Sequence, residues 1–161
     1  MNHETAQSDW QTVASCLASQ NYISIVKGLV HHFTAIDDNH RHMLPTMRSD
    51  VILTYGKQCL IIDTKYYTST LQQYFDTRTI HSGNLYQIFA YVKNEAFHLK
   101  SKQINVAGML LYAKTDEQLA PDNTIQMIGN TISVKTLDLN QDFIHIAKQL
   151  DDIVPVSYTH L

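Results

Sequence analysis

Two apolar segments separated by only two residues constrain the fold of this chain more than any other feature. Residues 50–55 (DVILTY) and 58–65 (QCLIIDTK) are rich in the aliphatic and β-branched side chains that favour strands. A Gly-Lys pair at 56–57 lies between them, and glycine at the first central position suits a two-residue type II′ turn. The sequence therefore predicts an antiparallel hairpin in which Asp50 lies directly opposite Asp63.

The rest of the chain alternates between helical and strand patterns. Ser82 is predicted to cap a helix that runs to about Asn94, because apolar residues recur at the helical spacing at Leu85, Ile88, Phe89 and Val92. Residues 68–81 are polar and predict a loop or a short helix. Three more elements follow: a buried strand at 104–113, a hairpin at 124–138 that turns at Gly129-Asn130, and a helix at 140–150 with Phe143, Ile146, Ala147 and Leu150 on its apolar face. This order predicts an α/β fold with a mixed central β-sheet flanked by helices.

The predicted boundaries divide the chain into three parts. Residues 1–42 form a poorly defined N-terminal region, with a weak helical pattern over 1–20 and a strand or short helix within 22–36. Residues 43–155 form the main domain, and the stretch before its first long strand is predicted to be a loop. Residues 156–161 continue no pattern in the domain, so we treat them as a possible non-native tail.

The composition fits a folded domain and narrows its partners. The 161 residues suffice for one domain with a core, and the formal net charge of −3 argues against tight, independent binding to nucleic acid. No apolar run approaches the roughly 20 residues of a membrane span and no signal peptide is visible, so no membrane partner is expected. The two cysteines, Cys16 and Cys59, do not indicate a disulfide framework, which favours a cytoplasmic location.

Four of the nine histidines cluster shortly before the predicted hairpin: His31, His32, His40 and His42. A zinc site is conceivable there. Neither cysteine lies near these histidines in sequence, and their spacing matches no zinc-finger pattern. We therefore interpret them as solvated loop residues.

The acid and the base at the end of the second predicted strand indicate a site. Asp63 and Lys65 project from one face, because side chains alternate across a strand. A directly opposed Asp50 would bring two carboxylates together with Cβ atoms about 4.5–5.5 Å apart, and Mg²⁺, which prefers oxygen ligands, would remove their repulsion. The backbone carbonyl of Thr64 can complete the ligand set, and Lys65 can orient a water or neutralise a phosphate. Ordinary solvated residues at a strand end are the competing interpretation.

Five segments together carry the pattern of a known family: MRSDVIL (47–53), LIIDTKYY (60–67), HSGNLYQIFAYVKN (81–94), GMLLYAKT (108–115) and TISVKTLDLNQDF (131–143). In combination they resemble the McrC subunit of the 5-methylcytosine-specific, GTP-dependent restriction system. The similarity covers roughly residues 43–154. It implies membership of the PD-(D/E)xK nuclease superfamily and a restriction-endonuclease-like fold.

The resemblance also implies roles for individual residues. Asp50 and Asp63 correspond to metal ligands for Mg²⁺, for which Mn²⁺ can substitute, and Lys65 corresponds to the catalytic lysine. Serine stands at position 49, where the family pattern often has proline. The superfamily often adds a glutamate from an upstream helix, but Glu4 is the only glutamate before Glu95, so no residue is assigned to that role.

The predicted helix after residue 81 carries further candidates. Gln87 and Tyr91 match a Q-x-x-x-Y motif of RecB-like members of the superfamily, and their spacing puts them on one helix face. They are expected either to contact DNA or to support the metal site, and a polar face that packs over the sheet is the alternative. Ser82 and Asn84 lie at the helix start, where backbone amides can receive a phosphate. Simple capping is the competing role for Ser82.

The function implied by the resemblance is a DNA endonuclease subunit that hydrolyses phosphodiester bonds with Mg²⁺. Its partners would be a McrB-type AAA+ GTPase, through which alone GTP acts, and double-stranded DNA with modified cytosine. This chain is too short to include the N-terminal region by which McrC proteins dock to that partner. Two alternatives stay open: a catalytically inactive remnant that serves as an interaction module, and a stand-alone RecB-like repair nuclease.

Overall fold

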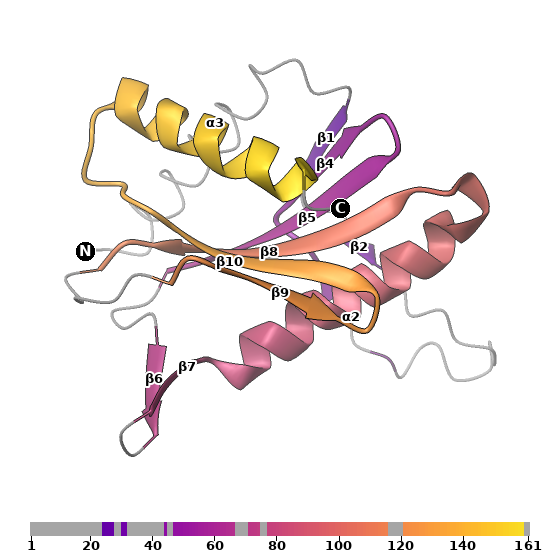
Figure 1. The fold of residues 1–161 in the computed structure, drawn as a ribbon, viewed down its shortest axis with the longest axis horizontal. Helices are drawn as coiled ribbons and strands as arrows, with labels where there is room; N and C mark the ends of the chain where they lie inside the picture. The colour runs from indigo at the N-terminus through magenta and orange to yellow at the C-terminus, as the bar shows by residue number, and fades with distance from the viewer. Residues whose placement is uncertain are drawn as a thin grey trace.

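A six-stranded mixed sheet with one helix on each face forms the body of the protein, which is described here by a computed structural model (Figure 1). The structure describes residues 24–27, 30–31, 44, 47–66, 71–74, 77–115 and 121–159. The strands of the sheet are, in spatial order, β1 (Ser24–Lys27), β4 (Val51–Tyr55), β5 (Gln58–Lys65), β8 (Asn105–Ala113), β10 (Asn130–Leu137) and β9 (Asn123–Met127). Pairs β5–β8 and β8–β10 are parallel, and the other neighbours are antiparallel. The predicted mixed α/β architecture is therefore confirmed.

Two long helices, two small sheets and one short 3₁₀ helix accompany the central sheet in the described part of the chain. Helix α2 covers one sheet face and α3 the other (Figure 1). Two small two-stranded sheets pair β2 with β3 and β6 with β7. The bounds are β2 (Val30–His31), β3 (Met47–Arg48), β6 (Leu71–Tyr74), β7 (Thr77–Ile80), α2 (Ser82–Leu99), η2 (Lys100–Lys102) and α3 (Phe143–Thr159). Among the described residues, no helix is both long and apolar enough to cross a membrane.

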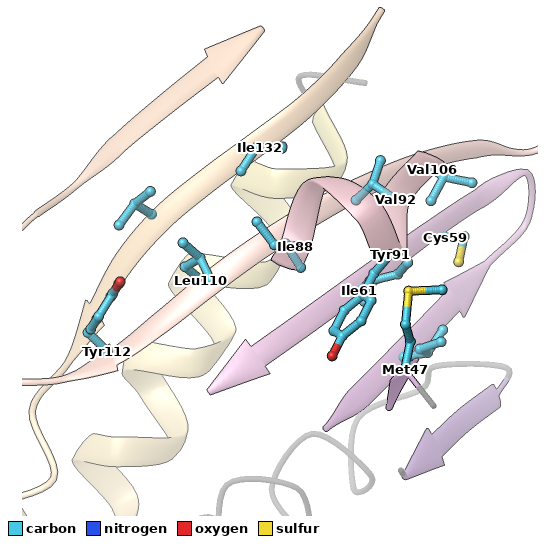
Figure 2. Packing of buried hydrophobic residues seen from close by; sticks show 12 residues of the cluster. Met47, Cys59, Ile61, Ile88, Tyr91, Val92, Val106, Leu110, Tyr112 and Ile132 are labelled. Carbon is cyan, nitrogen blue, oxygen red and sulfur yellow. The ribbon is translucent and has the colours of Figure 1, made fainter. Parts of the chain in front are cut away.

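The three parallel strands owe their central place to unbroken apolar sequence. Strand β8 is buried at every position after its first residue, as expected for a strand covered on both faces. Its alternate side chains enter two cores, one against α3 and one against α2. Ile61, Ile88 and Tyr91 lie between α2 and the sheet (Figure 2).

The predicted hairpin at 50–65 is confirmed in position, turn and register. Strands β4 and β5 pair from Val51–Ile62 to Tyr55–Gln58, which leaves Gly56 and Lys57 as the turn. Gly56 has a φ of +57°, whereas Lys57 has no positive φ, as a type II′ turn requires. The ladder nevertheless ends at Val51, so Asp50 lies just outside the strand rather than within the predicted pair with Asp63.

Helix α2 presents the predicted apolar stripe to the sheet, but its ends differ from the prediction. Ile88 and Val92 are fully buried, and the helix continues to Leu99 because Ala96 and Leu99 also pack on the core. Ser82 is the first helical residue rather than the cap. The N-cap is His81, which has no side-chain capping bond; its carbonyl accepts hydrogen bonds from the amides of Asn84 and Leu85.

Residues 68–81, predicted as a loop or short helix, instead contain the β6–β7 hairpin, which projects beside the start of α2 (Figure 1). The prediction was wrong because the segment has no apolar alternation, although its Thr, Tyr and Ile residues favour strands. Strands β1 and β2 confirm the strand alternative for 22–36. Met47–Arg48 is a short strand within a segment predicted as a loop, because it pairs with β2.

The last hairpin and the last helix need smaller corrections. Asn130 pairs with Met127, so the turn residues are Ile128 and Gly129, not Gly129 and Asn130. Both have positive φ, as in a type I′ turn, although an isoleucine is strained there. Helix α3 begins at Phe143, later than predicted. Phe143 is exposed at the helix start, whereas Ile146 and Leu150 are buried as predicted.

Candidate active site at the end of strand β5

The candidate site lies where β5 ends, on the sheet face that α2 covers. Cys59 and Ile61 belong to the core beneath α2, and the alternation of the strand carries Asp63 and Lys65 onto the same face. Helix α2 faces this end of the strand through Gln87, whose Oε1 accepts a hydrogen bond from Lys65. The structure therefore brings together a buried acid, a lysine and a polar helix residue from two different elements.

Asp63 is a buried carboxylate with an incompletely satisfied oxygen. Its residue is only 3% exposed, and Lys65 Nζ lies 2.6 Å from its Oδ2. The ammonium is the one partner of Oδ2 within the described ranges, and no neutral donor adds a hydrogen bond to it. Burial raises the pKa of Asp63 despite the opposing effect of the Lys65 ammonium, and the negative charge of Asp50 raises it further. An oxygen in this state is suited to a cation.

Asp50 occupies a bend before β4 and reaches across to the end of β5. Its Oδ2 accepts hydrogen bonds from the amide of Thr64 at 2.7 Å and from Thr64 Oγ1 at 2.6 Å. Its other oxygen, Oδ1, accepts no hydrogen bond from the part of the chain that the structure describes. The two carboxylates are near enough to interact electrostatically, as predicted, but Asp50 is exposed whereas Asp63 is buried.

A chain of directed hydrogen bonds runs from Lys65 through α2 to the segment before Asp50. Lys65 Nζ donates to Gln87 Oε1 at 2.9 Å, Gln87 Nε2 donates to the Tyr91 hydroxyl at 2.7 Å, and that hydroxyl donates to the Arg48 carbonyl at 3.0 Å. A carbonyl can only accept, so the Tyr91 hydroxyl must direct its proton there. Tyr91 thereby accepts from the Gln87 amide, which turns the amide oxygen toward Lys65.

This chain places Gln87 and Tyr91 in a supporting position for the site. Gln87 contacts Lys65 directly, and Tyr91 is 3% exposed and packs in the core beneath α2. The burial of Tyr91 leaves little of it for a DNA contact. The polar packing that was the alternative interpretation is also present, because the two side chains lie between α2 and the sheet.

The two candidate residues at the start of α2, Ser82 and Asn84, lie in different environments. Asn84 is buried and donates from Nδ2 to the Tyr112 hydroxyl at 2.9 Å. Tyr112 pairs with Lys65 in the β5–β8 ladder, so this bond holds the start of α2 over the strand end. Ser82 is exposed. Sequence reasoning missed Tyr112 and the Thr64 side chain, because neither is part of a motif.

The other titratable groups do not enlarge the site. Across the described ranges, no group of three or more His, Cys, Asp or Glu side chains is placed to hold a metal. Of the four clustered histidines, only the backbone of His31 lies within the described residues. Cys59 is a buried free thiol, and burial raises its pKa to about 12. A cation at this site would therefore have two carboxylates, with the Thr64 carbonyl and water as further oxygen ligands.

Comparisons with known proteins agree with the resemblance read from the five segments. The chain is 31% identical over 121 residues to the type IV methyl-directed restriction enzyme EcoKMcrBC of Escherichia coli (strain K12), a match that covers 74% of this chain and 33% of that protein. The McrC-type assignment is thus confirmed, while the chain spans about a third of the length of this curated relative. No protein-family profile matches the chain.

A solved structure adds a likeness of fold. The structure is the refined half-complex from a tetradecameric assembly of Thermococcus gammatolerans McrB AAA+ hexamers with bound McrC. One of its chains aligns with a TM-score of 0.56 over 88% of this chain and 30% of that chain, at 12% sequence identity. At this identity the match establishes the fold and nothing about activity.

Proposed function

We propose that this McrC-type chain carries the Mg²⁺-dependent nuclease centre of a modified-cytosine-specific restriction complex, within a restriction-endonuclease-like PD-(D/E)xK fold. The observation that carries the proposal is the buried Asp63 beside Lys65, with the Asp50 carboxylate held at the same strand end. The relative of known function is a methyl-directed restriction enzyme, which supports methylated DNA as the substrate.

The residues present fit a divalent cation. Asp63 Oδ2 is buried with the Lys65 ammonium as its one partner among the described residues, and Asp50 Oδ1 accepts no hydrogen bond from them. Asp50, Asp63 and the Thr64 carbonyl would hold the ion, which would supply a Lewis acid for the phosphoryl oxygen and lower the pKa of a bound water. Two carboxylates suit Mg²⁺, which usually keeps several water ligands.

Lys65 would act on the substrate from a fixed position. Its ammonium lies between Asp63 Oδ2 and Gln87 Oε1, and both partners are acceptors. An ammonium has three donors, so one donor remains for a scissile phosphate or an attacking water. A positioned positive charge there stabilises the negative charge that develops on the phosphate oxygens during hydrolysis.

The partners of the complex are also part of the proposal. The likeness to a chain from an assembly of McrB AAA+ hexamers with bound McrC supports a McrB-type AAA+ GTPase as the partner, with GTP acting only through it. Such a partner would supply the DNA affinity that a chain with a net charge of −3 lacks. Modified cytosine in duplex DNA would be the feature recognised by the complex.

One observation favours a second candidate function, an inactive interaction module. Among the described residues, the site offers only two carboxylates as charged ligands for a metal ion. In that case Asp50 and Asp63 would be ordinary strand-end residues.

Calorimetric titration of the purified 161-residue chain with Mn²⁺ separates the two functions. The proposal predicts saturable binding by the wild type that Asp63→Ala abolishes and that Asp152→Asn leaves unchanged. Asp152 is an exposed carboxylate on α3, on the other sheet face, and is the matched control. Binding that survives in Asp63→Ala, or no binding by the wild type, would refute the nuclease proposal. Cleavage of methylated duplex DNA with the partner and GTP would then test the activity itself.

A further inference from the structure

Thr64 lies between the two proposed catalytic residues of β5, and its amide faces a gap in the sheet. The β4–β5 ladder ends with the pair Val51–Ile62, two residues before Thr64. Alternate amides of a strand point to the same neighbour, so the Thr64 amide points past the end of β4. Asp50 Oδ2 accepts from this amide at 2.7 Å in place of a strand carbonyl.

The Thr64 hydroxyl makes a second bond to the same carboxylate oxygen. Thr64 Oγ1 donates to Asp50 Oδ2 at 2.6 Å, the short distance typical of a hydroxyl that donates to a charged acceptor. Both donors therefore lie on Oδ2, and Oδ1 receives neither. Two donors from one residue fix both the position and the rotation of the carboxylate, which is otherwise exposed and free to change rotamer.

We propose that Thr64 is a positioning residue that fixes Asp50 through its amide and hydroxyl, so that Oδ1 is presented to a divalent cation. This inference rests on the proposed metal-dependent function and adds to it a residue whose side chain no motif assigns. Thr64 acts through Asp50, and its side chain touches neither substrate nor metal. The carbonyl of Thr64, a candidate ligand itself, is a separate contribution that side-chain substitutions leave in place.

Side-chain substitutions of Thr64 isolate the hydroxyl. Thr64→Val keeps the shape and the strand preference but removes the donor, and Thr64→Ser keeps the donor. In Mn²⁺ calorimetry on the full chain, Thr64→Val is expected to bind about fivefold more weakly than the wild type. That factor corresponds to the loss of one hydrogen bond of about 1 kcal/mol. Thr64→Ser is expected to bind within about twofold of the wild type, because it retains the hydroxyl.

The same titration series distinguishes failure of this inference from failure of the proposed function. Wild-type binding that Asp63→Ala abolishes, together with an unchanged or tighter Thr64→Val, overturns the role of Thr64 alone. A Thr64→Ser variant as weak as Thr64→Val also overturns it, since the hydroxyl would then be irrelevant. Absence of wild-type binding overturns both proposals. Thermal unfolding of Thr64→Val in the absence of metal shows whether the variant is folded, and Thr64→Ala replaces it if not.

Discussion

Replacing Gly108 by alanine should force α2 away from the sheet. A Cβ at position 108 would lie 2.7 Å from Ile88 Cγ1 and 2.8 Å from Val92 Cγ2, closer than carbon atoms pack. Both neighbours are fully buried and β-branched, so neither side chain has a free rotamer into which it can turn. The strain must therefore be relieved by a shift of the helix.

The expected cost follows from this overpacking. One inserted carbon in a close-packed core typically costs about 1–3 kcal/mol. For a domain of this size each kcal/mol lowers the melting temperature by about 2–4 °C, so Gly108→Ala should melt about 2–12 °C lower. Because α2 also carries Gln87, a shift of the helix should lengthen the Lys65–Gln87 bond and reduce the proposed nuclease activity as well.

Thermal unfolding monitored by circular dichroism measures the melting temperature of Gly108→Ala, with Gly83→Ala as the matched control. Gly83 lies in the first turn of α2, and a Cβ added there would have no neighbouring atom within 4 Å, so Gly83→Ala should raise stability by up to about 1 kcal/mol. An Ile88→Ala background removes the closest clash, so Gly108→Ala should cost less there than in the wild type. An unchanged melting temperature, or an equal cost in both backgrounds, would refute the steric argument.

Two further predictions concern the site itself. Tyr91→Phe leaves the Arg48 carbonyl and the Gln87 amide without their hydrogen-bond partner, so the free energy of unfolding measured in urea should fall by about 1–3 kcal/mol. Because Tyr91 acts on the site through Gln87 and Lys65, the proposed DNA cleavage should slow by a larger factor than Mn²⁺ binding weakens. Equal losses in cleavage and binding would contradict a role through Lys65. For Asp63, the raised pKa means that the folded state favours the protonated acid, so the ionised form lowers stability at neutral pH. Without metal, the free energy of unfolding of Asp63→Asn should therefore exceed that of the wild type at pH 7. The difference should shrink as the pH falls to about 4 and below, where the wild-type carboxyl becomes protonated in both the folded and the unfolded state. A wild type that is more stable than Asp63→Asn at pH 7 would contradict this prediction.

The part of the fold that depends on neighbours in sequence could be predicted. The β4–β5 hairpin follows from two apolar runs and a glycine that can take positive φ, and these fix the register to the residue. The apolar stripe of α2 is equally local. The β6–β7 hairpin was missed because a small two-stranded sheet needs no apolar alternation, so periodicity gave no signal.

For the candidate site, the sequence predicted that Asp63 and Lys65 share one face, but it did not predict the contacts that hold them. Alternation along β5 places Asp63 and Lys65 on one face whatever the rest of the chain does. The contact of Asp50 with Thr64 depends on where β4 begins, and a difference of one residue at a strand end decides it. The bond from Tyr91 to the Arg48 carbonyl joins residues that are 43 positions apart, which no single-sequence pattern can specify.

Two of the contacts that sequence reasoning missed hold the same short segment, residues 48–50. From α2, Tyr91 binds the Arg48 carbonyl, and from β5, Thr64 binds the Asp50 carboxylate. Ser49, between them, is fully buried. The segment that carries Asp50 is thus held by β5, which carries Asp63 and Lys65, and by α2, which carries Gln87. A displacement of either element must therefore move Asp50 relative to Asp63 and Lys65, which explains how a site built largely on one strand end depends on the packing of α2.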